Sequence, residues 1–283
     1  MKRVLVTGAA GRLGRATLRL LAANGVAATA LDRVPVEDAP ADRLLVGEVT
    51  DVAMVRSALT GVDTVIHCAA IPAPMLDTPE RVFGLNTLAT FVVLEEAARA
   101  GIQRATFASS QSILGISFGE RKIKPLYVPL DADHPLQIAD PYALSKQADE
   151  ATAQMMCRKY GMTIVALRYP FLGGLGDRLP IMAQACVTDP TKGIGTLWAY
   201  LEDRDAAQAA WLAVTAPLSG YHMFNVAAPE TFAPQPTAEL VARYFPEAEI
   251  RTQILGHGVP VDTTPATETL GFKPEHLYSW DNT

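Results

Sequence analysis

The sequence is poor in several features that define large classes of proteins. Its three cysteines, Cys68, Cys157 and Cys186, lie far apart, so they indicate no disulfide framework, and a reducing, cytoplasmic location is expected. The five histidines are scattered and form no metal motif, so no metal is expected. The formal net charge is −6 without any basic run, which argues against nucleic acid as a partner. No run of about 18 uncharged apolar residues occurs, which argues against a membrane span.

Short apolar segments that alternate with longer amphipathic ones predict an α/β fold. Continuously apolar strands of this kind form a parallel sheet with helices on both faces, the doubly wound (Rossmann) arrangement. The expected strands are 3–8, 26–32, 43–48, 63–69, 104–110 and 162–170, and the clearest helices are 12–25, 79–100 and 142–160.

The pattern becomes less regular in the second part of the chain. Residues 1–170 are expected to form the core, and residues 171–283, with many Gly and Pro, a small substrate-binding lobe interwoven with it. The stretch 115–139 shows little periodicity, and a loop of this length inside a compact domain is usually functional or mobile.

Three glycines follow the first expected strand. In VTGAAGRLGRA, Gly8, Gly11 and Gly14 stand between a strand and a helix. A tight turn needs a residue that tolerates positive φ, and close approach of the backbone to a diphosphate leaves no room for a side chain. The amides and the dipole at the start of the following helix attract the anion. The sequence therefore predicts a dinucleotide site at this turn.

An acidic residue ends the second expected strand. Asp32 lies roughly 20 residues past the glycines, where a carboxylate accepts hydrogen bonds from the hydroxyls of an adenosine ribose. The same carboxylate would repel the 2′-phosphate of NADP, so NAD is the expected cofactor. Arg33 leaves the alternative open, because a guanidinium at that position could hold a phosphate.

A tyrosine and a lysine four residues apart open the helix expected at 142–160. Positions i and i+4 share one helix face, so Tyr142 and Lys146 should point into the same cavity. An ammonium beside a phenol favours the ionised phenol, which would make Tyr142 a proton donor or acceptor near neutral pH. A Tyr-x-x-x-Lys pair is also common on ordinary surfaces, so the spacing alone leaves both interpretations open.

Five motifs, in this order, resemble the extended short-chain dehydrogenase/reductase family, also called the NAD-dependent epimerase/dehydratase family. They are TGAAGRLG (7–14), GEVTD (47–51), HCAA (67–70), FASS (107–110) and YALSK (142–146). The resemblance covers nearly the whole chain. It implies that Ser110 hydrogen-bonds the reacting oxygen, that Tyr142 is the acid/base, and that Lys146 holds the nicotinamide ribose and supports Tyr142.

The resemblance also implies which residues contact the cofactor and the substrate. Glu48 and Val49 fall where the family touches adenine, usually with Asp, and Asn86 falls where the family often has an Asn at a helix start. The residues expected to bind NAD are Gly8, Gly11, Arg12, Leu13, Gly14, Asp32, Arg33, Glu48, Val49, Ala69, Ala70, Ile71, Asn86, Tyr142, Lys146 and Tyr169. Those expected to bind the substrate are Ser110, Gln111, Ser112, Tyr142, Phe171 and Arg178.

Two apolar residues depart from the nucleotide-sugar branch of the family. Phe171 stands where such epimerases usually have an Asn, and Trp198 where they tend to have an Arg, both directed at the substrate diphosphate. Apolar groups there would leave two phosphates without donors, so a pocket closed to nucleotide sugars is expected. The closest likeness is to small uronate dehydrogenase-type members, in which polar residues contact sugar hydroxyls and an Arg holds the carboxylate. Gln111, Ser112 and Arg178 match those roles, with a surface position as the alternative for Arg178.

The expected function is hydride transfer between NAD and a small polyhydroxylated substrate such as a free sugar or sugar acid. One alternative is a nucleotide-sugar epimerase or dehydratase that retains its NAD. Another is a noncatalytic NAD(H) sensor, against which the intact Ser110, Tyr142 and Lys146 argue. Helices 79–100 and 142–160 match those that make dimer contacts in the family, so a homodimer is expected.

Overall fold

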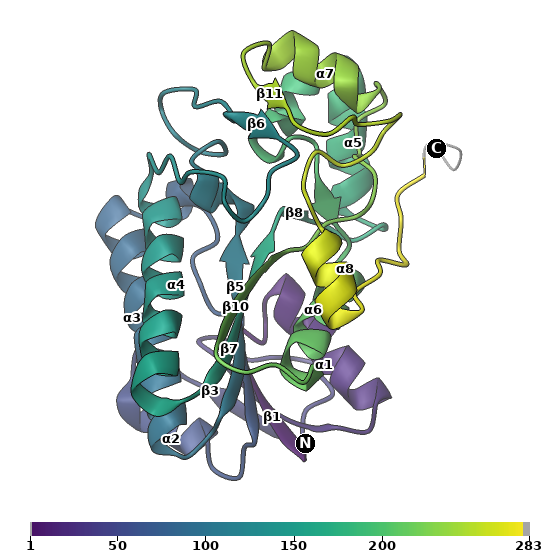
Figure 1. Cartoon of the computed structure of the whole chain (residues 1–283). Helices are drawn as coiled ribbons and strands as arrows, with labels where there is room; N and C mark the ends of the chain where they lie inside the picture. Colours follow the sequence, from purple (N-terminus) through teal and green to yellow (C-terminus); the bar gives the residue numbers. More distant parts are fainter. Residues whose placement is uncertain (1, 280–283) are drawn as a thin grey trace.

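The computed structural model describes residues 2–279, so Met1 and the end of the predicted lobe, 280–283, lie outside it. Its centre is a seven-stranded sheet with the strand order β10-β7-β5-β4-β1-β2-β3 and parallel pairing throughout (Figure 1). The strands are β1 (Arg3–Thr7), β2 (Ala27–Asp32), β3 (Arg43–Val46), β4 (Thr64–His67), β5 (Arg104–Ser110), β7 (Thr163–Tyr169) and β10 (Tyr221–Asn225). The six strands expected from the sequence are thereby confirmed.

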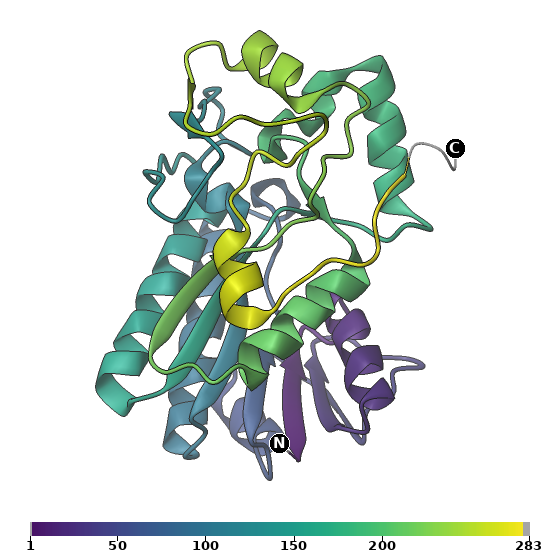
Figure 2. The ribbon, with the colours of Figure 1, turned by 45° about the vertical axis from the view of Figure 1, so that its right-hand side comes forward.

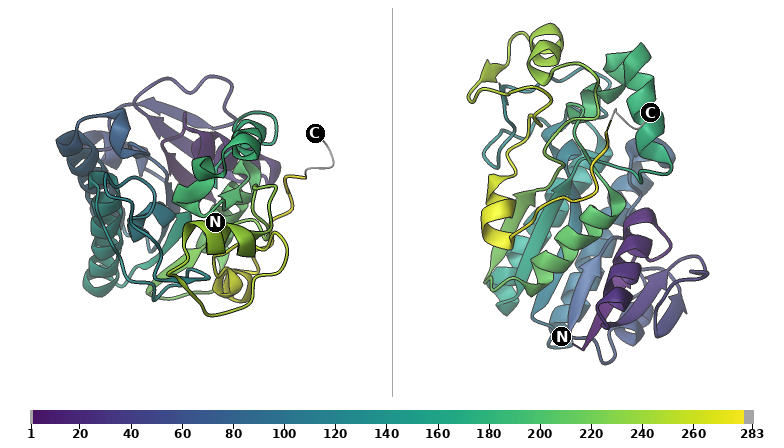
Figure 3. Two further views of the ribbon diagram at one scale, coloured as in Figure 1. Left: turned by 90° about the horizontal axis from the view of Figure 1, so that it is seen from above. Right: turned by 90° about the vertical axis from the view of Figure 1, so that its right-hand side faces the viewer.

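Helices cover both faces of this sheet, as the doubly wound prediction requires. One apolar core lies between the sheet and α2 (Val52–Ala58), α3 (Pro79–Arg99) and α4 (Pro141–Tyr160). A second core lies between the opposite face and α1 (Arg12–Ala23), α6 (Asp203–Thr215) and α8 (Thr264–Leu270). Figures 2 and 3 show these two helix layers on either side of the strands. Among residues 2–279, no helix has both the length and the apolar character needed to cross a membrane.

Local sequence fixes where the long helix α4 begins and ends. The side chain of Asp140 accepts a hydrogen bond from the amide of Ala143 (2.8 Å), and Pro141 occupies the first helical position. Gly161, with φ of 69°, ends the helix in the left-handed conformation. Because α4 starts near the carboxyl ends of β5 and β7, its first turn delivers Tyr142 to that edge of the sheet.

A small lobe with its own apolar core lies beyond the carboxyl edge of the sheet, at the top of Figure 1. Buried Trp198, Tyr200 and Phe232 belong to this core. Its elements are β6 (Tyr127–Val128), β8 (Phe171–Leu172), α5 (Arg178–Thr188), β9 (Tyr200–Leu201), α7 (Thr237–Tyr244), β11 (Glu249–Ile250) and the 3₁₀ turn η3 (Pro190–Thr196). The stretch 115–139 belongs to the lobe as well, since β6 pairs with β11 and Leu130 is buried.

The chain returns from the lobe to the core before it ends. Helix α6 packs on α1, and β10 pairs with β7 at the edge of the sheet. Neither element was recognised in the sequence, because the strand YHMFN (221–225) mixes polar and apolar residues and lies within the irregular second part. Residues after 171 thus supply one strand and one covering helix to the core.

Candidate active site

The glycine turn packs so closely against neighbouring backbone that two of its positions leave no room for a Cβ. Gly8 has φ of 64°, and a Cβ on it would lie 2.6 Å from the amide nitrogen of Ala69. A Cβ on Gly14 would overlap the carbonyl oxygen of Gly8. Helix α1 starts at Arg12 without a side-chain cap, since Gly11 is its N-cap. The first amides of α1 are therefore left for an anion.

Asp32 ends β2 beside this turn, as the sequence predicts. Its Oδ2 accepts a hydrogen bond from the amide of Ala10 (2.9 Å) and its Oδ1 one from Val34 (3.2 Å). The carboxylate therefore braces the glycine turn and still has lone pairs for a ribose hydroxyl. Arg33 next to it is exposed.

Tyr142 and Lys146 lie on one face of α4, and both are buried. The Lys146 Nζ lies 5.7 Å from the centre of the Tyr142 ring and donates to the carbonyl oxygen of Ala108 (2.9 Å). It also donates to Oδ2 of Asp149 (3.2 Å). The Phe118 and Tyr142 rings pack in an edge-to-face arrangement, with their centroids 6.0 Å apart. The interpretation as a mere surface pair is wrong, because neither side chain reaches the surface.

Ser110 ends β5, and the 3₁₀ turn η2 (Gln111–Leu114) follows it directly. Its Oγ accepts a hydrogen bond from the amide of Ser112 (3.1 Å). Within residues 2–279 the Ser110 hydroxyl donates to no acceptor, so its hydrogen can be donated to a ligand.

One cavity of about 740 Å³ joins these groups, and it lies between the sheet edge and the lobe. Gly8, Ser110, Tyr142 and Lys146 all line it. Of the residues expected to bind NAD, the cavity is lined by Gly8, Gly11, Arg12, Leu13, Gly14, Ala70, Tyr142, Lys146 and Tyr169. All six expected substrate contacts, Ser110, Gln111, Ser112, Tyr142, Phe171 and Arg178, line it too.

Two polar side chains in this cavity form no side-chain hydrogen bond or ion pair with another described residue. Gln111 is buried, yet neither its Nε2 nor its Oε1 has a hydrogen-bond partner within residues 2–279. Arg178 stacks its guanidinium on the Phe171 ring, 4.7 Å from the ring centre, and forms no ion pair in the described part of the chain. A buried amide without partners is costly unless a ligand supplies them.

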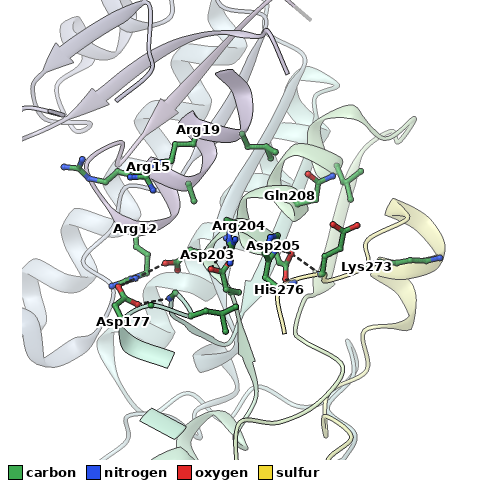
Figure 4. Close-up of a pocket in the computed structure, with 18 of the residues that line it drawn as sticks. Arg12, Arg15, Arg19, Asp177, Asp203, Arg204, Asp205, Gln208, Lys273 and His276 are labelled. Carbon is green, nitrogen blue, oxygen red and sulfur yellow. Dashed lines mark hydrogen bonds and ion pairs between the residues drawn. The ribbon is translucent and has the colours of Figure 1, made fainter. Parts of the chain in front are cut away.

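Arg12 lines the cavity and also contacts the second half of the chain. Its Nη1 donates to Oδ2 of Asp177 (2.7 Å) and to Oδ2 of Asp203 (2.8 Å). Figure 4 shows this cluster at the wall of a second, open cleft between α1, α6 and the C-terminal segment. Arg12 lines both this cleft and the 740 Å³ cavity, so the cluster stands between them.

Asn86 is not at a helix start, contrary to expectation, but in the interior of α3. Its Oδ1 accepts from the amide of Ile71 (2.8 Å), and its Nδ2 donates to the Ile71 carbonyl (3.1 Å) and to Ser145 Oγ (3.1 Å). The side chain is fully used in tying the segment after β4 to α4. Its contribution to a cofactor site is thus indirect.

Other expected contacts lie beside the cavity. Ala69 and Ile71 do not line it, although the Ala69 backbone abuts Gly8. Val49 is buried in the core under α2, whereas Glu48 is exposed. The hydroxyl of Tyr169 donates to the carbonyl of Ala206 (3.0 Å), so only its ring faces the cavity.

The expectation that Trp198 closes the pocket is wrong. Its backbone has φ of 59°, which turns the indole into the core of the lobe, and the ring N–H donates to the Pro190 carbonyl (2.7 Å). Trp198 is fully buried and does not line the cavity. Of the two departures from the nucleotide-sugar pattern, Phe171 alone faces the ligand space.

Several residues that line the substrate end of the cavity were missed in the sequence. They come from α5, from short 3₁₀ turns and from loops of the core and the lobe, and nothing in their local pattern marked them. They are Met75, Leu76, Ser117, Phe118, Met182, Thr191, Lys192, Ile194, Thr196 and Phe232.

Comparison with known proteins assigns the family. The sequence model of the NAD dependent epimerase/dehydratase family matches residues 4–227, so the chain belongs to that family. This confirms the resemblance noted in the sequence. The structure is also similar to that of a short-chain dehydrogenase/reductase superfamily protein from Agrobacterium tumefaciens with bound NAD. Its TM-score is 0.74 at 25% identity, and the match covers 99% of this chain and 94% of the other.

Two curated relatives are dehydrogenases by name. A uronate dehydrogenase from Pseudomonas putida is 30% identical over 168 residues, 59% of this chain and 59% of that protein. An L-arabinose 1-dehydrogenase (NAD(P)(+)) from Haloferax volcanii is 29% identical over 180 residues, 61% of this chain and 68% of that protein. The match to the uronate dehydrogenase thus spans about three-fifths of that relative's length.

The residues present fit the cofactor that the family uses. Gly8, Gly11 and Gly14 line the cavity without side chains, and the amides at the start of α1 have no side-chain cap. NAD would lie with its diphosphate at Gly11 and Leu13, its adenosine ribose toward Asp32 and its nicotinamide end toward Lys146.

Proposed function

We propose that the protein is an NAD-dependent dehydrogenase of a small, polyhydroxylated, anionic substrate, with a free sugar acid as the preferred class. The observation that carries this proposal is Gln111, whose buried amide has no protein partner in a cavity lined by Ser110 and Tyr142. A substrate rich in hydroxyl groups satisfies such an amide, and an apolar one does not. The names of the uronate and arabinose dehydrogenases support the same class.

The residues divide the chemistry between them. Ser110, whose oxygen is engaged by the Ser112 amide, donates its hydrogen to the reacting oxygen and orients it. Tyr142 takes the proton of the substrate hydroxyl as the carbonyl forms, and Lys146 holds a positive charge near the phenol. NAD, when bound, supplies the hydride acceptor. The Phe118 ring packs against the phenol ring.

Arg178 is the proposed partner of the substrate carboxylate. It lines the cavity without an ion pair in the described residues, and its contact with Phe171 holds the guanidinium against the wall. A guanidinium binds a carboxylate with two parallel hydrogen bonds, which favours an acid over a neutral sugar.

The substrate prediction is tested with a panel of ligands. Uronates are expected to form NADH and to raise the melting temperature, because a ligand at about a hundred times its Kd stabilises the native state by ~2.7 kcal/mol. UDP and UDP-sugars should do neither.

Arg178→Met should raise KM for uronates at least about tenfold, the loss of roughly 1.4 kcal/mol of binding, and leave KM for a neutral sugar unchanged. A thermal shift with UDP alone, or transfer without net NADH, would instead support the epimerase alternative.

Cofactor preference is the next expected result. The wild type should use NAD over NADP by at least about tenfold in kcat/KM, roughly 1.4 kcal/mol, because the Asp32 carboxylate opposes a 2′-phosphate. Asp32→Asn should narrow that gap, since it keeps an oxygen for the Ala10 amide and removes the charge. Arg33→Ala is the companion variant and should keep the preference for NAD over NADP, because the Asp32 carboxylate is unchanged. Equal use of both cofactors by the wild type would show that Arg33 governs the site.

We also propose a homodimer through α3 and α4 and a reducing, cytoplasmic location. Helices α3 and α4 pack side by side and expose apolar side chains on the face away from the sheet, which supports a second copy as the occupant. These side chains are Phe83, Leu88, Phe91 and Leu144. Sedimentation equilibrium should give twice the chain mass of 30.3 kDa. The three free cysteines support the location.

A further inference from the structure

A buried carboxylate accompanies the lysine of the active site. Asp149 lies less than one turn after Lys146 on α4, is 0% exposed, and accepts a hydrogen bond from Lys146 Nζ at 3.2 Å. Among residues 2–279 it is the one carboxylate paired with Lys146. Taking an ammonium and a carboxylate out of water is expensive unless each neutralises the other. The pair is therefore a buried ion pair of the site and not an ion pair on the surface.

Among the described residues, Lys146 makes two hydrogen bonds, which leaves one N–H of its ammonium free. An ammonium has three donors, of which one goes to the carbonyl of Ala108 and one to Asp149. The third can reach the ligand space that Tyr142 also lines. Two fixed bonds from two elements, β5 and α4, thus determine the direction of the third.

Of the groups around Lys146, Asp149 contributes most to keeping its ammonium charged. Burial alone would lower the pKa of Lys146. The charge of Asp149 and, after it, that of Tyr142 outweigh this effect, so the pKa of Lys146 is raised. Burial, helped by the charge of Lys146, lowers the pKa of His67 on β4 to about 3, so His67 is neutral. Burial raises the pKa of Cys68 to about 12, so the thiol is protonated. Neither neighbour can replace the carboxylate.

The surroundings of Asp149 itself add no second cation. Thr90 of α3 faces it with a hydroxyl, while its Oδ1 has no hydrogen-bond partner in the described residues. Glu150 is the next acid, but it is bound by Arg168 of β7 through two hydrogen bonds (2.9 and 2.8 Å). Tyr169 of β7 is buried, and burial raises its pKa, so it carries no charge. Burial raises the pKa of Asp149, and Lys146 offsets part of that effect.

We propose that Asp149 is a positioning residue for the reaction, which keeps the buried Lys146 protonated and directs its remaining N–H toward cofactor and phenol. The proposal rests on the proposed dehydrogenase function for its kinetic readout only. Its consequence for pH has a definite sign. With Asp149 present, Lys146 keeps its charge well into the alkaline range. Without it, the charge is lost as pH rises through a lowered pKa, and the contribution of Lys146 is lost with it.

The test compares Asp149→Asn with the wild type between pH 6 and 10. The variant should bind NADH, measured by its fluorescence, within about threefold of the wild type at pH 6 and at least about tenfold more weakly at pH 9.5, a loss of roughly 1.4 kcal/mol. With a turned-over substrate, kcat/KM of the variant should fall on the alkaline side where the wild type stays level. Asp149→Glu, which keeps the charge, should restore the wild-type shape even if the rate is lower.

Controls separate this role from a structural one. Glu95→Gln removes a buried carboxylate that pairs with Lys159 near the other end of α4, and its pH profile should follow the wild type. Parallel profiles for Asp149→Asn and the wild type, lowered or not, would overturn the proposal. If Asp149→Asn fails to fold, Asp149→Glu and Asp149→Ser replace it. A pH profile of wild-type shape for Asp149→Glu and an altered shape for Asp149→Ser would support the proposal, and equal shapes for the two would overturn it. Absence of any turnover would count against the dehydrogenase function alone, because NADH binding still reports on Asp149.

Discussion

Tyr142→Phe is expected to lower kcat at least about a hundredfold while NADH binds within about twofold of the wild type. The change removes one oxygen and leaves the ring against Phe118 and Lys146, so only the path of the proton is lost. The two quantities are measured separately, by steady-state NADH formation and by fluorescence titration of NADH.

The matched control for this variant lies on the same helix. Tyr160 ends α4 and donates its hydroxyl to Oε1 of Glu95 (2.6 Å), far along the helix from the cavity. Tyr160→Phe should therefore keep the wild-type kcat and lose only stability. A Tyr142→Phe variant that retains more than a tenth of the rate would remove Tyr142 from its acid/base role.

Gly14→Ala is expected to have the second largest effect, on both the fold and the cofactor site. The added Cβ would overlap the backbone of Gly8 and come 2.7 Å from the Cα of Ala9, and a backbone cannot rotate aside as a side chain can. Overpacking of this kind costs about 1–3 kcal/mol of unfolding free energy. Since the turn must open to accept the methyl group, NADH affinity should also fall more than about tenfold, roughly 1.4 kcal/mol.

Gly84→Ala provides the opposite outcome from the same chemical change. Gly84 lies inside α3, and a Cβ there would meet nothing within 4 Å. Alanine is favoured over glycine in a helix by about 1 kcal/mol, so this variant should be more stable and bind NADH normally. Urea unfolding curves and NADH titrations of both variants give the comparison. A Gly14→Ala protein as stable as the wild type would contradict the close approach of the turn.

The parts that the sequence predicted well are those made by neighbours in the chain. The glycine turn, Asp32 at the end of β2 and the pair on α4 depend on spacing within one or two elements, and all three are where they were expected. Asp149 gave such a signal too, since an acid three residues after Lys146 lies on the same side of the helix. It was overlooked because the motif ends at the lysine.

The parts that the sequence could not predict are those made by distant segments. Arg12 meets Asp177 and Asp203, 165 and 191 residues away, and no local pattern marks such contacts. The resemblance placed Trp198 at a phosphate-binding position, but its ring is buried in the core of the lobe. Asn86 satisfied a family pattern while its amide was engaged by Ile71 and Ser145. In each case packing of the lobe or core decided the direction of the side chain.

The return of the chain from the lobe to the sheet determines the order in which the protein can be completed during synthesis. Strand β7 is finished at Tyr169, but its partner at the sheet edge, β10, spans Tyr221–Asn225. Helix α6, which covers the face of β5 and β7, lies between β7 and β10 in the sequence. A nascent chain that has emerged only to residue 170 therefore carries an unpaired edge and an uncovered apolar face, both of which attract other chains. The lobe is thus not a module that can be exchanged or removed, because the segment that ends it is also the segment that closes the core.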